Sequence, residues 1–222
     1  MHSTLKQLNL IKNKINDIIN KKQLKTRTKI IVVTKTFSLN NIIPLLQNGH
    51  IHYGENKIQE AEKKWSETKK KYKNLQLHMI GKLQSNKARK ALQLFNYIHS
   101  LDNERLALKL SEYQKELRKN IKYFIQVNLA DEKHKSGISL TELNHFYNFC
   151  IKKLSLNIIG LMCLPPMDSD PQEYFKLLKK TATKLNLNEL SMGMSADFEL
   201  AVLNGSTYLR LGTLIMGKRN FI

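Results

Sequence analysis

The sequence has few cysteines and lacks a long hydrophobic run. Its two cysteines, Cys150 and Cys163, are too few for a disulfide framework and do not have the spacing of a zinc site, so we expect two buried thiols. The longest nearly unbroken apolar stretch, residues 158–167, contains two prolines and is about half as long as the roughly twenty residues that a membrane-spanning helix needs. The opening residues mix lysine with apolar residues and lack the features of a signal peptide. We therefore expect a cytoplasmic protein that does not enter a membrane.

Acidic residues and arginine are also scarce. The chain has 37 Lys and Arg against 18 Asp and Glu, a formal net charge of +19, and only six of the 37 cations are arginine. Such a surface attracts polyanions, but proteins that read nucleic-acid sequence rely on arginine forks and aromatic stacking. Because the lysines are scattered from end to end, the pattern favours a solvated surface. We expect no specific nucleic-acid partner, and a basic nucleic-acid binder stays as an alternative.

The overall composition is that of a globular protein. Of the 222 residues, 41% are hydrophobic and 25% are charged, which excludes collagen-like, coiled-coil and wholly disordered chains. The sequence contains no internal repeat, linker or composition break. We expect one domain that spans residues 1–222.

Short apolar segments alternate with amphipathic helical patterns along the chain. Residues 29–35 are β-branched and apolar on both faces, as in a strand of a buried parallel sheet. An amphipathic helix at 3–20 precedes them. The same reasoning predicts strands at 29–35, 50–55, 76–81, 97–102, 123–130, 157–164, 189–194 and 208–216. It predicts helices between them at 38–48, 56–71, 85–95, 103–119, 139–154, 171–185 and 196–204.

Eight strands separated by helices indicate an α/β fold. The pattern favours a single (β/α)8 barrel of the TIM type with an extra N-terminal helix. A doubly wound open sheet is the alternative, because periodicity alone cannot close a barrel.

In such a barrel, functional groups gather at the C-terminal ends of the strands. Lys35 is notable there because an apolar strand leads directly into it, and a partly desolvated lysine amine is suited to Schiff-base chemistry. The alternative is a lysine that extends into solvent. The positions at the predicted strand ends, where polar residues concentrate, are Lys35, Glu55 and Asn56, Gly81 to Ser85, Asp102, Asn128, Met162, Ser195, and Arg210 to Thr213.

The last two strands predict an anion site. Gly193 to Ser195 leads into a helix N-terminus, whose free N–H groups suit a phosphate, and Gly212 and Thr213 lie beside it, after strand eight. Arg210 stands on an otherwise apolar strand, where burial requires a partner. That partner is either a ligand or a distant carboxylate such as Glu55 or Asp102. A lysine amine, a phosphate site and an inward arginine around one mouth suggest pyridoxal 5′-phosphate.

Other motifs are weaker. His50 and His52 lie on one face of a strand at its start, but no third ligand has the spacing of a metal site. The sequence contains no nucleophile elbow, Walker loop or dinucleotide-binding glycine motif.

The sequence resembles the pyridoxal phosphate homeostasis proteins (YggS/PROSC family) in segments that span nearly the whole chain. This resemblance implies a fold like the N-terminal barrel of alanine racemase, with the cofactor held as a Schiff base on Lys35. It also implies that Ser195, Gly212 and Thr213 hold the phosphate, that Arg210 faces the pyridine nitrogen, and that Asn56 lies near the cofactor. The segments are Val33-Thr-Lys35, Tyr53-Gly-Glu-Asn56, His78-Met-Ile-Gly-Lys-Leu-Gln-Ser-Asn-Lys87, Gln126-Val-Asn128, Lys135-Ser-Gly137, Gly160-Leu-Met162, Ser191-Met-Gly-Met-Ser195 through Asp197, and Arg210-Leu-Gly-Thr213.

The resemblance implies a carrier of the cofactor rather than an enzyme. We expect a monomer that releases pyridoxal phosphate to partners, which include apo forms of pyridoxal-phosphate-dependent enzymes. The alternative is a cofactor-dependent enzyme such as a weak amino-acid racemase. We expect the second domain of racemases to be absent, since the chain ends at Ile222 soon after strand eight. A barrel residue such as His78, or a dimer partner, could replace the opposing acid–base group of that domain.

Overall fold

The computed structural model describes residues 2–132 and 135–218. Its strands are short and begin close to the predicted positions. They are β1 (Lys29–Val33), β2 (His52–Glu55), β3 (Gln76–Met79), β4 (Tyr97–Leu101), β5 (Lys122–Asn128), β6 (Ile138–Ser139), β7 (Asn157–Met162), β8 (Glu189–Ser191) and β9 (Tyr208–Leu211).

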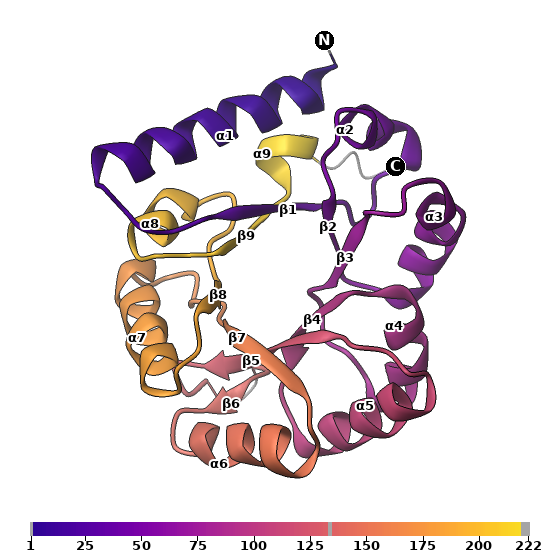
Figure 1. The fold of residues 1–222 in the computed structure, drawn as a ribbon. Coiled ribbons are helices and arrows are strands. Elements are labelled where there is room, and N and C mark those ends of the chain that lie inside the picture. The colour runs from indigo at the N-terminus through magenta and orange to yellow at the C-terminus, as the bar shows by residue number, and fades with distance from the viewer. Residues whose placement is uncertain (1, 133–134, 219–222) are drawn as a thin grey trace.

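Eight of these strands close into a parallel barrel (Figure 1). The order around the barrel follows the chain from β1 to β5, then β7, β8 and β9, and β9 pairs with β1. In that closing pair Ile31 lies opposite Arg210. The two-residue β6 pairs with β5 beside the ring. The predicted (β/α)8 barrel is therefore confirmed, and the open sheet is excluded.

Helices surround the barrel, and α1 lies across its outer surface near α8 and α9 (Figure 1). The N-terminal helix predicted at 3–20 is confirmed. The α-helices are α1 (Ser3–Lys21), α2 (Ile43–Gln47), α3 (Ile58–Lys71), α4 (Ala88–Leu94), α5 (Glu104–Glu116), α6 (Leu143–Asn148), α7 (Pro171–Lys184), α8 (Phe198–Leu203) and α9 (Thr213–Met216). Short 3-10 segments η1 (Leu39–Asn41) and η2 (Ser85–Lys87) precede α2 and α4, and a π-helical segment η3 (Phe149–Lys153) follows α6.

Local sequence explains several helix ends. The Asn103 side chain accepts a hydrogen bond from the Leu106 N–H at 2.9 Å and so caps α5. Asp170 caps α7 in the same way, ahead of Pro171 at the first helical position. Gly49 has φ +77, which ends α2 close to the predicted end of that helix at residue 48.

One predicted element is wrong in type and others are wrong in extent. The strand predicted at 208–216 ends at Leu211, and Thr213–Met216 forms α9. A short apolar run fits a strand or a helix equally well; here the apolar side chains Ile215 and Met216 are buried from a helical turn. The helix predicted at 139–154 begins only at Leu143, although the Ser139 hydroxyl does accept a hydrogen bond from the Glu142 N–H at 3.3 Å.

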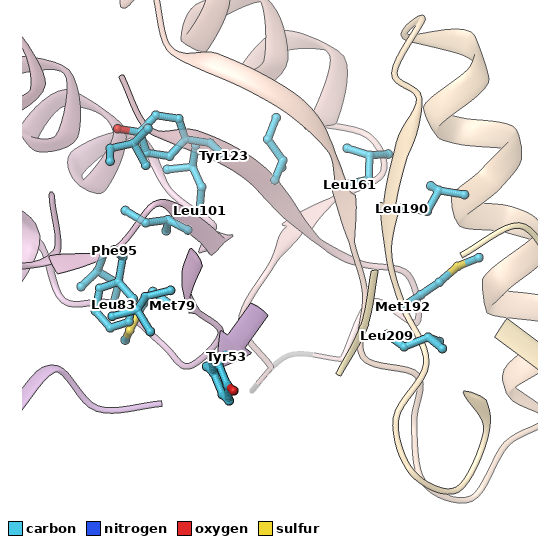
Figure 2. Close-up of a cluster of buried hydrophobic side chains, with 14 of the residues drawn as sticks. Tyr53, Met79, Leu83, Phe95, Leu101, Tyr123, Leu161, Leu190, Met192 and Leu209 are labelled. Atoms are coloured by element: carbon cyan, nitrogen blue, oxygen red, sulfur yellow. The ribbon is translucent and has the colours of Figure 1, made fainter. Parts of the chain in front are cut away.

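The main hydrophobic core lies between the barrel and the helices. Because successive strand residues point to opposite faces, one set of strand side chains packs outward against the helices, as for Tyr53, Tyr123 and Leu161 (Figure 2). Trp65 and Phe175 contribute to this core from α3 and α7. The barrel interior holds a much smaller apolar cluster, namely Ile31, Tyr97, Phe124, Met162 and Tyr208. The interior therefore has room for polar side chains.

None of the helices in the part of the chain that the structure describes combines the length and the apolar character needed to span a bilayer.

Candidate functional site

The six predicted site residues follow four adjacent strands of the barrel. Ser195 comes after β8, Arg210 lies on β9 with Gly212 and Thr213 following it, Lys35 comes after β1, and Asn56 comes directly after β2. Because the strands are parallel, their C-terminal ends meet at one mouth of the barrel. The structure thus brings all six residues to one sector of that mouth.

Lys35 lies two residues beyond β1, in a turn. Its side chain is half-buried. The next residue, Thr36, has φ +68, in the left-handed region that only a small share of non-glycine residues adopt. The chain therefore turns immediately after Lys35 rather than continuing the strand.

A buried ion pair fixes the backbone just before Lys35. Lys64 Nζ donates to Glu55 Oε1 at 2.9 Å and to the Thr34 carbonyl at 2.7 Å. The same Glu55 oxygen accepts from Thr34 Oγ1 at 2.7 Å and from Trp65 Nε1 at 2.9 Å. Sequence reasoning missed this cluster, since the signal was only a lysine nine residues after Glu55 on the following helix.

Arg210 is 5% exposed and forms hydrogen bonds with uncharged groups. Its Nη1 donates to Ser191 Oγ at 2.7 Å and its Nη2 donates to the Cys163 carbonyl at 2.9 Å. Burial lowers the pKa of Arg210. The predicted alternative, a pairing with Glu55 or Asp102, is wrong. Glu55 bonds to Lys64, and the Asp102 carboxylate accepts from the Asn103 side chain at 2.6 Å.

The buried guanidinium is near one carboxylate, that of Asp197, whose charge raises the pKa of Arg210 but does not offset the effect of burial. Among the described residues, no carboxylate forms an ion pair with Arg210. Arginine has five N–H donors and cannot accept a hydrogen bond, so several donors remain for a ligand. A buried cation in this state favours a ligand with an acceptor atom or negative charge.

The predicted anion site consists of two loops that touch. Ser195 Oγ accepts from the Leu214 N–H, in the first turn of α9, at 3.5 Å. Gly212 caps α9, and a Cβ atom placed there would lie 3.6 Å from Val33 Cβ. The end of β9 thus packs against the end of β1, which leads to Lys35.

Gly193 shapes the loop that carries Ser195. Its φ is +91, and a Cβ atom there would lie 2.4 Å from Ala201 Cβ. The Met194 N–H donates to Asp197 Oδ1 at 2.6 Å. Glycine is required at this position for both conformation and space, and the loop is fixed without using the Ser195 hydroxyl as a donor.

Asn56 opens onto a cavity of about 380 Å³ in the same mouth. Gly81 packs against the Asn56 backbone so closely that a Cβ atom would lie 2.4 Å from the Asn56 carbonyl oxygen. Asn128, across the cavity, donates from Nδ2 to the Glu132 carbonyl at 3.0 Å and so orders its own loop. The polar residues that line the cavity are Asn56, Lys82, Gln126, Asn128, Lys135 and Ser136.

Below Arg210 the barrel interior is lined with histidine. His99 Nδ1 lies 2.8 Å from Ser191 Oγ, the atom to which Arg210 donates, and hydrogen bonds continue through His78 to His52. Sequence reasoning missed this arrangement. The available signal was one histidine at an inward-facing position in each of three consecutive strands.

The two cysteines are buried thiols, as predicted. Burial raises the pKa of each to about 12. Both are therefore protonated and unreactive at neutral pH. Of the residues that the structure describes, no group of three or more His, Cys, Asp or Glu could hold a metal ion.

Comparisons with known proteins identify the family of this chain. The family model for the alanine racemase N-terminal domain matches residues 7–220. A pyridoxal phosphate homeostasis protein of Synechocystis is 38% identical over 200 residues, which cover 86% of this chain and 91% of that protein. The Escherichia coli protein of the same name is 32% identical over 86% of each chain.

Solved structures show the same fold. PipY of Synechococcus elongatus, solved with pyridoxal phosphate bound, superposes with a TM-score of 0.80 at 33% identity, covering 91% of this chain and 100% of PipY. An alanine racemase of Clostridium difficile shares the fold with a TM-score of 0.72 at 13% identity, and the match covers 97% of this chain but 56% of the racemase. This chain belongs to the pyridoxal phosphate homeostasis protein family, whose barrel is that of the alanine racemase N-terminal domain.

Proposed function

We propose that this protein binds pyridoxal 5′-phosphate in the C-terminal mouth of its barrel, attaches it to Lys35, and carries it to other proteins without catalysing turnover. The observation that carries the proposal is the buried Arg210 guanidinium, which has spare donors and no ion-pair partner among the described residues. The names of the relatives and the cofactor bound to PipY support it.

Each residue has a role that its position suits. Lys35 would hold the cofactor through Nζ, which would form a C=N bond with the aldehyde carbon as one water leaves. Ser195, Gly212 and Thr213 would supply hydroxyl and backbone N–H donors to the phosphate. Arg210 would donate to the ring nitrogen.

One further feature supports the cofactor site. Asn56 lines the neighbouring cavity and is half-buried, so its amide can contact the ring substituents. When bound, the cofactor supplies an electrophilic carbon that amines attack and a ring that withdraws electrons.

The carrier role rests on the position of His78. Racemisation needs a placed proton donor and acceptor on opposite faces of the ring, and Lys35 serves one face. His78, the histidine that the sequence offered for the other face, is fully buried, and both its ring nitrogens bond to other histidines. Its position therefore favours binding over turnover.

Spectroscopy of the purified protein tests the covalent link. With pyridoxal phosphate added, we expect a yellow Schiff-base band that borohydride removes, and peptide mapping should place the reduced label on Lys35. Lys35→Ala should lose the band and keep its thermal unfolding midpoint. Lys82→Ala is the matched control, because Lys82 lines the same mouth, and it should keep the band. Label on another lysine with Lys35 unmodified would refute the assignment.

A second experiment separates carriage from catalysis. The loaded protein should activate an apo form of a pyridoxal-phosphate-dependent enzyme and should leave each common L-amino acid unracemised. Turnover of one amino acid well above that of free pyridoxal phosphate, lost in Lys35→Ala, would establish an enzyme instead.

A further inference from the structure

The opposite mouth of the barrel contains a cavity of about 680 Å³. This volume falls in the range of small-molecule sites. The cavity lies at the N-terminal ends of the strands, and nothing in the proposed cofactor site uses it. Its polar lining comes mainly from the first residues of strands: Lys29, His52, Gln76, Tyr97, Lys122, Glu189 and Tyr208.

A chain of hydrogen bonds links this cavity to Arg210 through the barrel interior. His52 Nδ1 lies 3.0 Å from His78 Nε2, and His78 Nδ1 lies 2.9 Å from His99 Nε2. His99 Nδ1 lies 2.8 Å from Ser191 Oγ, which accepts from Arg210 Nη1 at 2.7 Å. The chain ends at His52, which lines the cavity.

Arg210 fixes which atom donates and which accepts in each hydrogen bond between itself and His52. It can only donate, so Ser191 must accept from it. The Ser191 hydroxyl hydrogen then has His99 Nδ1 as its acceptor among the described residues, and the large majority of buried hydroxyls are hydrogen-bonded. His99 therefore carries its hydrogen on Nε2.

The same logic continues outward to the cavity. His99 Nε2–H donates to His78 Nδ1, so His78 carries its hydrogen on Nε2 and donates to His52 Nδ1. Burial lowers the pKa of His78 and His99 well below 6.5. Burial, and then Lys29 and Lys122, lower the pKa of His52 to about 4. All three rings are therefore neutral at pH 7, and the remaining hydrogen of His52 is on Nε2, the ring nitrogen that does not contact His78.

Two lysines add positive charge at the same place. Lys29 Nζ lies 3.0 Å from Tyr208 Oη and 4.4 Å from the centre of that ring. Lys122 Nζ lies 3.4 Å from Tyr97 Oη and 5.2 Å from the centre of its ring. These contacts hold both ammonium groups at the cavity.

The positive charge exceeds the negative charge in the cavity wall. The cavity is lined by a single carboxylate of the described residues, Glu189, which lies 3.5 Å from Lys29. Lys122 contacts no carboxylate in the described ranges. The wall thus offers two ammonium groups and an imidazole N–H, all of them donors.

We propose that the N-terminal mouth is a binding site for a small oxyanion, a phosphate or a carboxylate, held by Lys29, Lys122 and His52 Nε2–H. The hydrogen-bond chain keeps His52 a donor, so Arg210 at one mouth sets the ligand preference of the other. Charge-assisted hydrogen bonds of this kind are the strong ones in proteins.

Nitrogen-15 NMR of the histidine side chains tests the proposal in the full chain without cofactor. At pH 7 and constant ionic strength in chloride, His52, His78 and His99 should each be neutral with the hydrogen on Nε2. Inorganic phosphate or acetate should shift His52 Nε2 saturably, and the two titrations distinguish a phosphate ligand from a carboxylate ligand. A His52 with its hydrogen on Nδ1, or no saturable shift with either anion, would overturn the proposal.

Variants separate this site from surface charge and from the cofactor site. Lys122→Met should weaken anion binding by about ten- to a hundredfold, as expected for one charge-assisted hydrogen bond. Lys57→Met removes the same charge from an exposed helix start and should leave the anion affinity unchanged. Equal losses of anion affinity in Lys122→Met and Lys57→Met would overturn the proposed site.

Thr213→Ala tests the proposed cofactor site and should not alter the anion-induced shift of His52. Failure of the anion-site proposal and failure of the cofactor-site proposal can therefore be told apart.

Discussion

Lys64 Nζ lies 2.9 Å from Glu55 Oε1, and the two side chains are 10% and 0% exposed. This ion pair is buried beside the turn that carries Lys35, and both members also bond to Thr34. Lys64 comes from α3, which follows β2 in the chain and packs back against the barrel. The helix thereby supports the end of β1.

Breaking this pair from one side should be costly. Lys64→Met leaves the Glu55 carboxylate buried without its cation, and such losses are about 3–5 kcal/mol in the free energy of unfolding. The double variant Lys64→Met with Glu55→Gln removes both charges and should recover part of that loss. Urea unfolding measures both. Lys63→Met, on the exposed face of the same helix, should change stability by less than about 0.5 kcal/mol; a similar loss in the two single variants would contradict the assignment.

The proposed phosphate site predicts a selective loss of affinity. Ser195→Ala and Thr213→Ala should each weaken pyridoxal phosphate binding by about ten- to a hundredfold, since each removes a hydrogen bond to a charged group worth about 1.5–3 kcal/mol. Fluorescence or absorbance titration measures the dissociation constant. Pyridoxal, which lacks the phosphate, should bind poorly to the unmodified protein. Thr183→Ala, on the outer helix α7, should bind as the unmodified protein does. Equal affinity for pyridoxal and its phosphate would refute the site.

The buried histidines predict a loss of stability in mild acid. Burial lowers the pKa of His50 to about 3 and that of His52 to about 4, and those of His78 and His99 also fall well below 6.5. Below pH 6.5 the unfolded chain takes up protons that the native histidines do not. Stability is therefore full above about pH 6.5 and declines as the pH falls toward 4, by up to about 1.4 kcal/mol per pH unit for each histidine.

Denaturant unfolding between pH 7.5 and 4.5 measures this slope. His50→Asn should reduce it, because one proton fewer is taken up on unfolding. His145→Asn, at a side chain that is 82% exposed, is the control and should keep the slope. A free energy of unfolding that is the same at pH 7.5 and pH 5 would contradict the prediction.

The net charge of +19 predicts weak, salt-sensitive binding to nucleic acids. Counterion release should reduce any RNA or DNA affinity steeply between low and physiological salt. Pyridoxal phosphate occupancy should change little over the same range, because the proposed site is partly buried. Filter binding and absorbance measure the two. Sequence-selective binding that survives physiological salt would support the nucleic-acid alternative.

The sequence alone predicted the alternation of strands and helices and identified the residues that lie at the C-terminal mouth. Strands such as β1 and β5 have apolar bodies that only a covered parallel sheet accommodates, and the strand ends are the polar exceptions. The last element could not be assigned because residues 212–216 have too few residues to show a helical period. The helix there is settled by packing of Ile215 and Met216.

The polar contacts inside the barrel could not be predicted in the same way. The bond between His78 and His99 depends on the register between β3 and β4, and register follows from closure of the whole ring. The Glu55–Lys64 pair depends on where α3 packs along the outside of the barrel, because that position decides whether Lys64 reaches the end of β2. Sequence reasoning places such side chains on the correct face but does not pair them.

The pairing of β1 with β9 also sets when the proposed site can exist during folding. Ile31 and Arg210 are neighbours across this seam although 179 residues separate them in the chain. Lys35 and Asn56 lie on one side of the seam, and Ser195, Arg210, Gly212 and Thr213 lie on the other. Contacts across such a distance form late, since a long loop must close first. A partly synthesised chain would therefore have Lys35 without the rest of the proposed site, and capture of the cofactor at that site would report that the last strand has joined the first.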